Sequence, residues 1–355
     1  MRLIFNVFVI ILSATASFAD PQFWQYEFPE TDFQKTSLES WFEIRSRGVG
    51  KDGIPALDHV KMIAVAEANI PASEPVITLE LAGQIPRAYP LCYMTWHEIV
   101  NDYVGDIPFT VTFCPLCNSA IVFDRRGHGQ VLDFGVTGQL RNSDMMKYDR
   151  QTFTWWQQAV GQGIVGELTG VELTVFPCWM ESFADFQARN HAGVVMDEPK
   201  YCRPYGNNPY RGYDSSARPF LFNGEFPPHD IEPLARVVRV GNRAWPLSRF
   251  SGGVKVIKEE GVILTWEGEQ ASALDQTNIA TSRKIAAIRT QDDAGNDIAN
   301  NVMFAFAFHA FWPDGVWMLE NQPRHQEIDL FRYIHVLFQL QIGDSAKKDY
   351  VLISD

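Results

Sequence analysis

Short runs of alternating apolar and polar residues restrict this chain to a fold built mainly from β-strands. From Ile107 to Phe113, apolar residues occupy every second position, and a similar alternation begins at Val76. A period of two places successive side chains on opposite faces of a strand. Glycine, asparagine and aspartate recur between such runs and predict turns. We therefore expect a mainly β (β-rich α+β) fold with short helices.

Two segments are assigned from local composition. Met94–Asp102 suits a short helix, whereas the aromatic segment Phe304–Trp312 is expected to be a strand. Only a short loop, Tyr103–Asp106, separates the first segment from the strand that begins at Ile107. A loop that short makes the two elements neighbours in space.

The composition excludes several classes of protein. Of 355 residues, 46% are hydrophobic and 21% are charged, so most of the chain can build a packed core. The formal net charge is -13, and the sequence has no cluster of lysine and arginine. We therefore expect no nucleic-acid partner. A small ligand or a partner in the cell envelope stays open.

The N-terminus has the pattern of a signal peptide. Arg2 precedes an apolar stretch, residues 3–12, and small residues then lead to Ser17-Phe18-Ala19. About ten apolar residues are too few to cross a membrane, which needs roughly twenty. We expect cleavage after Ala19 and a periplasmic or secreted protein. No transmembrane segment is predicted in the mature chain.

Two sequence blocks occur twice in the same order. Arg87–Leu91 recurs as Arg243–Leu247, and Thr112–Ala120 aligns without gaps with Thr265–Ala273. We interpret them as two related β units that arose by internal duplication and pack as one fold. Residues 20–199 would hold the N-terminal segment and the first repeat, 200–230 a connector rich in Pro, Gly and Tyr, and 231–355 the second repeat.

The first repeat carries a candidate site that the second lacks. Cys114 and Cys117 form a Cys-x-x-Cys pair, whereas the second repeat has Glu267 and Gln270 in their places. Three interpretations stay open: a copper or zinc site with His97 as third ligand, a thiol-redox pair, or a static disulfide. Convergence of Cys114, Cys117 and His97 on one partly accessible site is expected under the first.

Other residues have supporting or structural interpretations. Met94, Glu98 and Asp102 are possible supporting residues of the site, Met94 because it would share the helix face of His97. Three further cysteines bring the total to five, an odd number, and their states stay open. They are Cys92, Cys178 and Cys202. Aspartates in turn-like contexts are expected to cap backbone groups, and clustered aromatic residues to form core. These are Asp124, Asp144, Asp149, Trp155, Trp156, Trp179, Phe183 and Phe186.

Several long motifs resemble the bacterial DUF3179 family. They are Trp96–Asp102, Phe113–Arg125, Phe134–Asp144, Tyr148–Arg150 and Trp155–Gln158. The similarity extends from about Lys51 to Pro313, and Cys178 is a departure from the family pattern. The resemblance implies an exported or envelope-associated protein and supplies no reaction.

The sequence therefore supports two hypotheses of function. The first is an exported protein with a metal-binding or thiol-redox site at Cys114, Cys117 and His97. The second is a non-catalytic envelope binding module with a structural disulfide and an aromatic-lined ligand surface. Nothing in the residue pattern establishes an enzyme.

Overall fold

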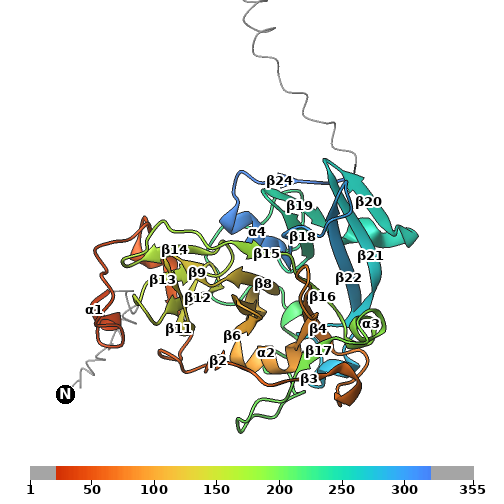
Figure 1. Ribbon diagram of the computed structural model, residues 1–355. Helices are drawn as coiled ribbons and strands as arrows, with labels where there is room; N and C mark the ends of the chain where they lie inside the picture. The colour runs from red at the N-terminus through yellow and green to blue at the C-terminus, as the bar shows by residue number, and fades with distance from the viewer. Residues whose placement is uncertain (1–20, 321–355) are drawn as a thin grey trace, which may run out of the picture. The chain divides into compact units, whose positions relative to one another are not determined.

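The computed structural model describes residues 21–320. The chain falls into a compact unit of residues 1–317 and a second unit of residues 318–355. The predicted signal peptide, residues 1–19, lies outside the described residues. Every described helix and strand belongs to the first unit (Figure 1).

The expectation of a mainly β fold with short helices is confirmed. The α-helices are α1 (Pro21–Trp24), α2 (Leu91–His97), α3 (Phe183–Arg189) and α4 (Ala305–Phe311). The 3-10 helices are η1 (Trp41–Glu43), η2 (Val65–Glu67), η3 (Pro115–Cys117), η4 (Tyr213–Ser215), η5 (Leu247–Gly253) and η6 (Ile279–Thr281). Among the described helices, none has the length and apolar character that crossing a membrane requires.

The described strands form six hydrogen-bonded sheets. One has the order β1 (Ile44–Ser46), β11 (Phe134–Arg141), β12 (Asp144–Asp149), β13 (Trp155–Gln157) and β14 (Gln162–Val165). The next has the order β15 (Val175–Phe176), β8 (Ser119–Asp124), β7 (Ile107–Cys114), β6 (Ile99–Val104) and β2 (Leu57–Asp58). A small sheet pairs β10 (Gln130–Val131) with β9 (Arg126–Gly127).

The remaining sheets complete the unit. One has the order β16 (Trp179–Ser182), β4 (Pro75–Leu79), β5 (Arg87–Pro90), β17 (Val194–Met196) and β3 (Met62–Ala64). Another has the order β23 (Asn301–Phe304), β18 (Arg236–Val240), β19 (Arg243–Pro246) and β24 (Val316–Trp317). The last has the order β20 (Val256–Glu259), β21 (Val262–Ala271) and β22 (Lys284–Asp292).

Two of these sheets share strand order and register. In β16-β4-β5-β17 and in β23-β18-β19-β24, an antiparallel hairpin has an antiparallel strand on one side and a parallel strand on the other. Val76 pairs with Pro90 in the first hairpin, and Val237 pairs with Pro246 in the second. A seven-residue helix follows β16, and another follows β23. The two Arg-Ala-aromatic-Pro-Leu motifs therefore occupy the same place in two similar sheets.

The second pair of matched segments agrees only at its start. Phe113 N donates to Glu98 O at 2.8 Å, and Trp266 N donates to Lys255 O at 2.9 Å, so the two hairpins match there. Beyond this point the first chain segment turns through η3 and returns as β8, whereas β21 continues to Ala271. The expectation of one local fold over Thr112–Ala120 and Thr265–Ala273 is therefore wrong. Pro115 has no N–H and ends the first strand.

The helix expected over Met94–Asp102 is only partly correct. Helix α2 begins at Leu91 and ends at His97, because Glu98 adopts a left-handed conformation with φ 61°. Ile99 and the residues after it belong to β6, which pairs along its whole length with β7. The β-branched residues of this segment and its pairing with β7 favour a strand over a helix.

The strand expected over Phe304–Trp312 is wrong, because Ala305–Phe311 forms helix α4. Ala305, Phe306, Ala307 and Phe308 are all buried, so neither face of this segment is polar. A segment buried on every side carries no period that separates a helix from a strand.

The aromatic residues expected in the core are buried: Trp155, Trp156, Trp179, Phe183 and Phe186. Trp24, Phe28 and Phe33 from the N-terminal segment pack on Trp155, with ring centroids 5.0–5.3 Å apart. Aromatic pairs at this spacing add to the stabilisation from burial. The segment Trp24–Phe33 is thus an integral part of the fold.

We predict that Gly138→Ala destabilises the protein strongly. Gly138 lies at the irregularity in β11 with φ +78°, and an added Cβ would lie 2.1 Å from Val49 O. We expect a loss of about 3 kcal/mol in the free energy of unfolding, measured by urea denaturation followed by tryptophan fluorescence. Gly129→Ala is the matched control, because Gly129 has φ +79° and open space around it. It should cost about 1 kcal/mol. Equal losses would contradict the contact with Val49.

Candidate metal site

The corner between β7 and β8 brings Cys114 and Cys117 together. Cys114 ends β7, and Pro115 opens η3, where its fixed φ suits a first helical position. Asn118 closes η3 with φ 51°, a left-handed conformation that asparagine tolerates. Cys114 and Ser119 then pair across the ladder. The short 3-10 turn therefore holds both cysteines on one tight corner.

The turn between β11 and β12 supplies a carboxylate. Asn142 and Ser143 both have positive φ, 50° and 63°, as a type I′ hairpin turn requires. Arg141 and Asp144 close the ladder next to this turn. Asp144 is therefore the first residue of β12, placed beside the cysteine corner.

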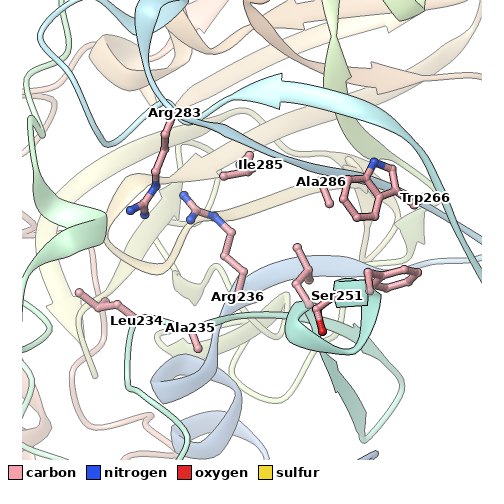
Figure 2. A pocket seen from close by; sticks show the side chains of 10 residues that line it. Leu234, Ala235, Arg236, Ser251, Trp266, Arg283, Ile285 and Ala286 are labelled. Atoms are coloured by element: carbon pink, nitrogen blue, oxygen red, sulfur yellow. The ribbon is translucent and has the colours of Figure 1, made fainter. Parts of the chain in front are cut away.

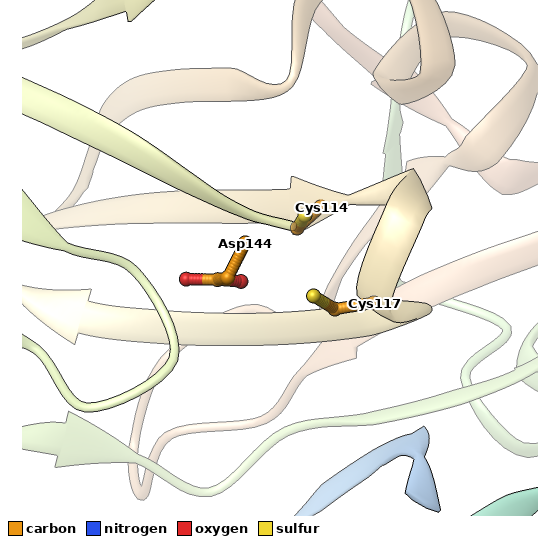
Figure 3. Close-up of side chains that lie close together, drawn as sticks. All are labelled: Cys114, Cys117 and Asp144. Carbon is orange, nitrogen blue, oxygen red and sulfur yellow. The ribbon is translucent and has the colours of Figure 1, made fainter. Parts of the chain in front are cut away.

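Cys114, Cys117 and Asp144 form one compact group (Figure 3). One ligand atom from each residue lies within 4.8 Å of the other two. The exposed fractions are 1% for Cys114 and 0% for both Cys117 and Asp144. Both cysteines are free thiols. The expected partly accessible site is thus a closed one.

Burial dominates the protonation of this group. It raises the pKa of the Cys114 thiol, and it raises the pKa of Cys117 well above its ordinary value. Burial also raises the pKa of Asp144 to about 6, against hydrogen bonds from Gln157 and the Ala159 backbone. Desolvation disfavours each charged form, so the thiols hold their protons at neutral pH. A cation among the three donors would reverse this preference.

Asp144 is only half satisfied by the protein. Its Oδ1 accepts from Gln157 Nε2 at 2.6 Å and from Ala159 N at 2.9 Å. Its Oδ2 is buried and has no hydrogen-bond partner among the described residues. The thiols of Cys114 and Cys117 lie beside this carboxyl and act on it as weak hydrogen-bond donors that lower its pKa, so they are the protein groups that can satisfy it.

A buried lysine, Lys147, lies within electrostatic reach of the group. Its side chain is fully buried, and Nζ lies 4.0 Å and 4.1 Å from the ring centroids of Phe123 and Phe134. Burial lowers the pKa of Lys147 well below its ordinary value, while the charges of Asp144 and Asp149 oppose this. Negative charge at Asp144 therefore favours the charged form of Lys147.

His97 does not join the group. Its Nδ1 lies 2.8 Å from Pro55 O, and its Nε2 lies 2.6 Å from the hydroxyl of Tyr205. Both ring nitrogens are therefore engaged by the protein. Burial lowers the pKa of His97, which favours a neutral ring. In this structure His97 contacts Tyr205 of the connector and is not a member of the group of Cys114, Cys117 and Asp144.

The three supporting residues have structural roles here. Glu98 accepts from Arg47 Nη1 at 2.8 Å and from the hydroxyl of Tyr210 at 2.9 Å. Asp102 accepts from Arg87 Nη1 at 2.8 Å and from the hydroxyl of Tyr89 at 2.9 Å. Met94 is fully buried in the core. Glu98 and Asp102 do not share a helix face, because Asp102 lies in β6.

Tyrosines of the connector cover this region. Tyr205 contacts His97, Tyr210 contacts Glu98, and the hydroxyl of Tyr213 donates to Leu116 O at 3.0 Å. Leu116 lies inside η3, between the two cysteines. The connector therefore closes the outer side of the cysteine corner.

Asp144 was expected to cap a turn, as were Asp124 and Asp149. Asp124 and Asp149 do accept from nearby backbone N–H groups, of Arg126 at 2.8 Å and of Thr152 at 2.6 Å. Asp144 instead accepts from residues that follow it by 13 and 15 positions. The only sequence signal for it was its place in the long motif Phe134–Asp144. The spacing of residues along the chain does not predict that this motif lies close to Cys114 in space.

These features define a mainly β protein with a buried group of two thiols and one carboxylate. A model of the family described as protein of unknown function (DUF3179) matches residues 51–315. The chain belongs to this family, as its motifs predicted. No curated protein and no solved structure matches the chain significantly.

We predict that the folded, metal-free protein exposes a single reactive thiol. Cys202 is exposed, whereas the other four cysteines are buried. With excess chelator, iodoacetamide should label Cys202 at least about 100-fold faster than Cys114 or Cys117. Peptide mass spectrometry locates the label, and Cys202→Ser should remove the fast phase. Rapid labelling of Cys114 or Cys117 would show that the corner opens.

Proposed function

We propose that this protein is an exported zinc protein in which Cys114, Cys117 and Asp144 bind one Zn²⁺. The observation that carries the proposal is the convergence of three buried donor groups within 4.8 Å. Tetrahedral Zn²⁺ with bonds of about 2.1–2.3 Å needs donor atoms a little under 4 Å apart. Small side-chain rotations would close the remaining distance. A divalent ion would replace the weak thiol hydrogen bonds to Asp144 with direct coordination.

The mixture of donors favours zinc over copper. Cysteine, histidine and carboxylate groups are all ordinary ligands of Zn²⁺. Cu(I) prefers soft sulfur donors and gains little from a carboxylate such as Asp144. Two thiolates and one carboxylate carry three negative charges, and a divalent ion offsets more of them than a monovalent one. Lys147 is placed to offset the remainder.

The burial of both sulfurs argues for metal coordination rather than thiol exchange, with three protein donors and the fourth position of a tetrahedral ion left to a non-protein ligand. Exchange needs an incoming thiolate to reach a sulfur atom, and it is fastest when the attacked pair is accessible. Cys114 and Cys117 are almost inaccessible, and burial raises the pKa of both thiols. Coordination inside the corner would instead link β7, η3 and β12.

Two further features of the sequence support proposals about origin and location. The apolar segment and small residues before Asp20 support export with cleavage after Ala19. The shared order and register of the β4-β5 and β18-β19 sheets support an internal duplication. An experimental structure in which these two sheets fail to superpose would contradict the duplication.

We predict one tightly bound zinc ion per mature chain. Protein expressed with its own N-terminus and recovered from the cell envelope is to be weighed by native mass spectrometry. The expected mass is that of a chain beginning at Asp20 plus one Zn²⁺. A mass that retains residues 1–19 would contradict export, and a chain without metal would contradict the site. A mass increase matching copper would assign the site to that metal instead.

Matched variants locate the metal. Cys114→Ser with Cys117→Ser should abolish zinc binding, because the soft donors are lost. Cys178→Ser is the control, because Cys178 is equally buried, its Sγ lies 3.8 Å from Ala120 O, and it is not one of the three proposed ligands. It should retain one zinc ion. Equal zinc content in the double variant and the control would contradict the proposal, provided that circular dichroism shows both to be folded.

We predict that zinc affinity falls as the pH falls. Zn²⁺ binds deprotonated donors, and burial raises the pKa of Asp144 to about 6 and those of both thiols above their ordinary values. Protons therefore compete more strongly at low pH, and affinity should drop at least about tenfold per pH unit below neutral. A chelator competition between about pH 5 and pH 8 measures it.

Asp144→Asn separates the carboxylate from the thiols in that experiment. The variant should bind zinc more weakly than the natural protein above about pH 6, where the Asp144 carboxylate is ionised. The difference should shrink below that pH, because the natural carboxyl is then protonated. A constant difference across the range would exclude Asp144 as a ligand.

A further inference from the structure

A cavity of about 430 Å³ lies in the second of the two similar sheets and its neighbouring strands (Figure 2). Its walls come from η5, from β21 and from the segments that begin β18 and β22. Most of the lining is apolar: Leu234, Leu247, Phe250, Trp266 and Ile285. None of the three proposed zinc ligands lines this cavity.

Two arginines enter the cavity from opposite sides, and Figure 2 shows their guanidinium groups facing each other. The side chain of Arg236 is only 8% exposed, and its buried Nε has no hydrogen-bond partner among the described residues. The side chain of Arg283 is 45% exposed. One end of an otherwise apolar cavity is thus positively charged and not fully satisfied.

Two carboxylates of the protein lie beside these arginines. Asp214, which is fully buried, lies 2.9 Å from Arg236 Nη2 and 2.8 Å from Arg283 Nη2. Asp275 adds a second carboxylate, which accepts from the Arg283 backbone. The Arg236 Nε is left without a protein acceptor among the described residues, so one hydrogen-bonding position at this end of the cavity stays open.

The first of the two similar sheets fills the corresponding position with protein atoms. Phe183 N donates to Glu74 O, and Ala305 N donates to Ala235 O, both at 2.8 Å, so Glu74 and Ala235 are equivalent. The Glu74 carboxylate is buried and accepts from Cys92 N at 2.7 Å. Ala235 has no such side chain and lines the cavity instead. The open space thus corresponds to a carboxylate that the other sheet supplies itself.

We propose that this cavity binds a small monocarboxylate with an apolar body, its carboxylate on Arg236 and Arg283 and its apolar part against Trp266 and Phe250. A carboxylate accepts paired hydrogen bonds from guanidinium groups, and these are stronger than neutral ones. The apolar walls bind the body of the ligand by excluding water.

Isothermal titration calorimetry of the full mature chain with decanoate tests the proposal. Decan-1-ol is the comparison ligand, because it has the same tail without the charge. We expect decanoate to saturate one site below about 1 mM and to bind at least about tenfold more tightly than the alcohol. Equal affinity for the two would overturn the role of the arginines. Absence of saturation by decanoate would overturn the site.

Two variants place the binding in this cavity. Ala235→Glu supplies the side chain that the first sheet has at this position, and it should abolish decanoate binding by occupying part of the cavity with a second carboxylate. Arg283→Gln should weaken decanoate binding at least about tenfold, because one guanidinium partner of the carboxylate is lost. The fold should tolerate this substitution, because the Arg283 side chain is half-exposed. Arg243→Gln is the matched control, because Arg243 does not line the cavity. This variant should bind decanoate with the same affinity as the natural protein. Unchanged affinity in Arg283→Gln would overturn the proposal even if Ala235→Glu did not fold.

Discussion

The ion pair between Arg47 and Glu98 joins three distant segments of the chain. The Glu98 side chain is fully buried, and it is reached by Arg47 from the N-terminal segment and by Tyr210 from the connector. A buried charge must be paired, and removing one partner typically costs about 3–5 kcal/mol. Glu98 also marks the point where α2 ends and β6 begins. The first sheet, its N-terminal cover and the connector are therefore interdependent, and the pair lies within electrostatic reach of Cys114.

The cysteine corner follows from the same constraint. Strand β7 is buried almost throughout, so a polar group at its end must be satisfied inside the protein. Asn118 and Ser119 are bonded by Val302 and Asn301 of β23, which locks the corner against the second of the two similar sheets. Asp144 and Lys147 come from β12 in a third sheet. The group is therefore built where separate sheets meet, and no single repeat contains all of its support.

The two similar sheets differ in what occupies equivalent positions. In one, Glu74 fills a buried space beside Cys92, and in the other, Ala235 leaves a cavity with two arginines. The regions beyond Phe113 and Trp266 differ as well, because Pro115 turns the chain sharply only in the first. A common backbone register thus coexists with different side-chain chemistry. Strand pairing tolerates such change, because side chains point away from the ladder.

The strand-rich class, the tight corner at Pro115 and the proximity of Cys114 to Cys117 can be predicted from the sequence, because alternation and turn chemistry are local properties. The sequence also determined the family, through long motifs. It did not determine that Ala305–Phe311 is helical, since a segment buried on every side has no diagnostic period. The meeting of Asp144 with the two thiols, in a group that does not include His97, follows from how distant strands pack. That meeting depends on which sheet packs on the corner, and packing between distant strands leaves no spacing in the sequence.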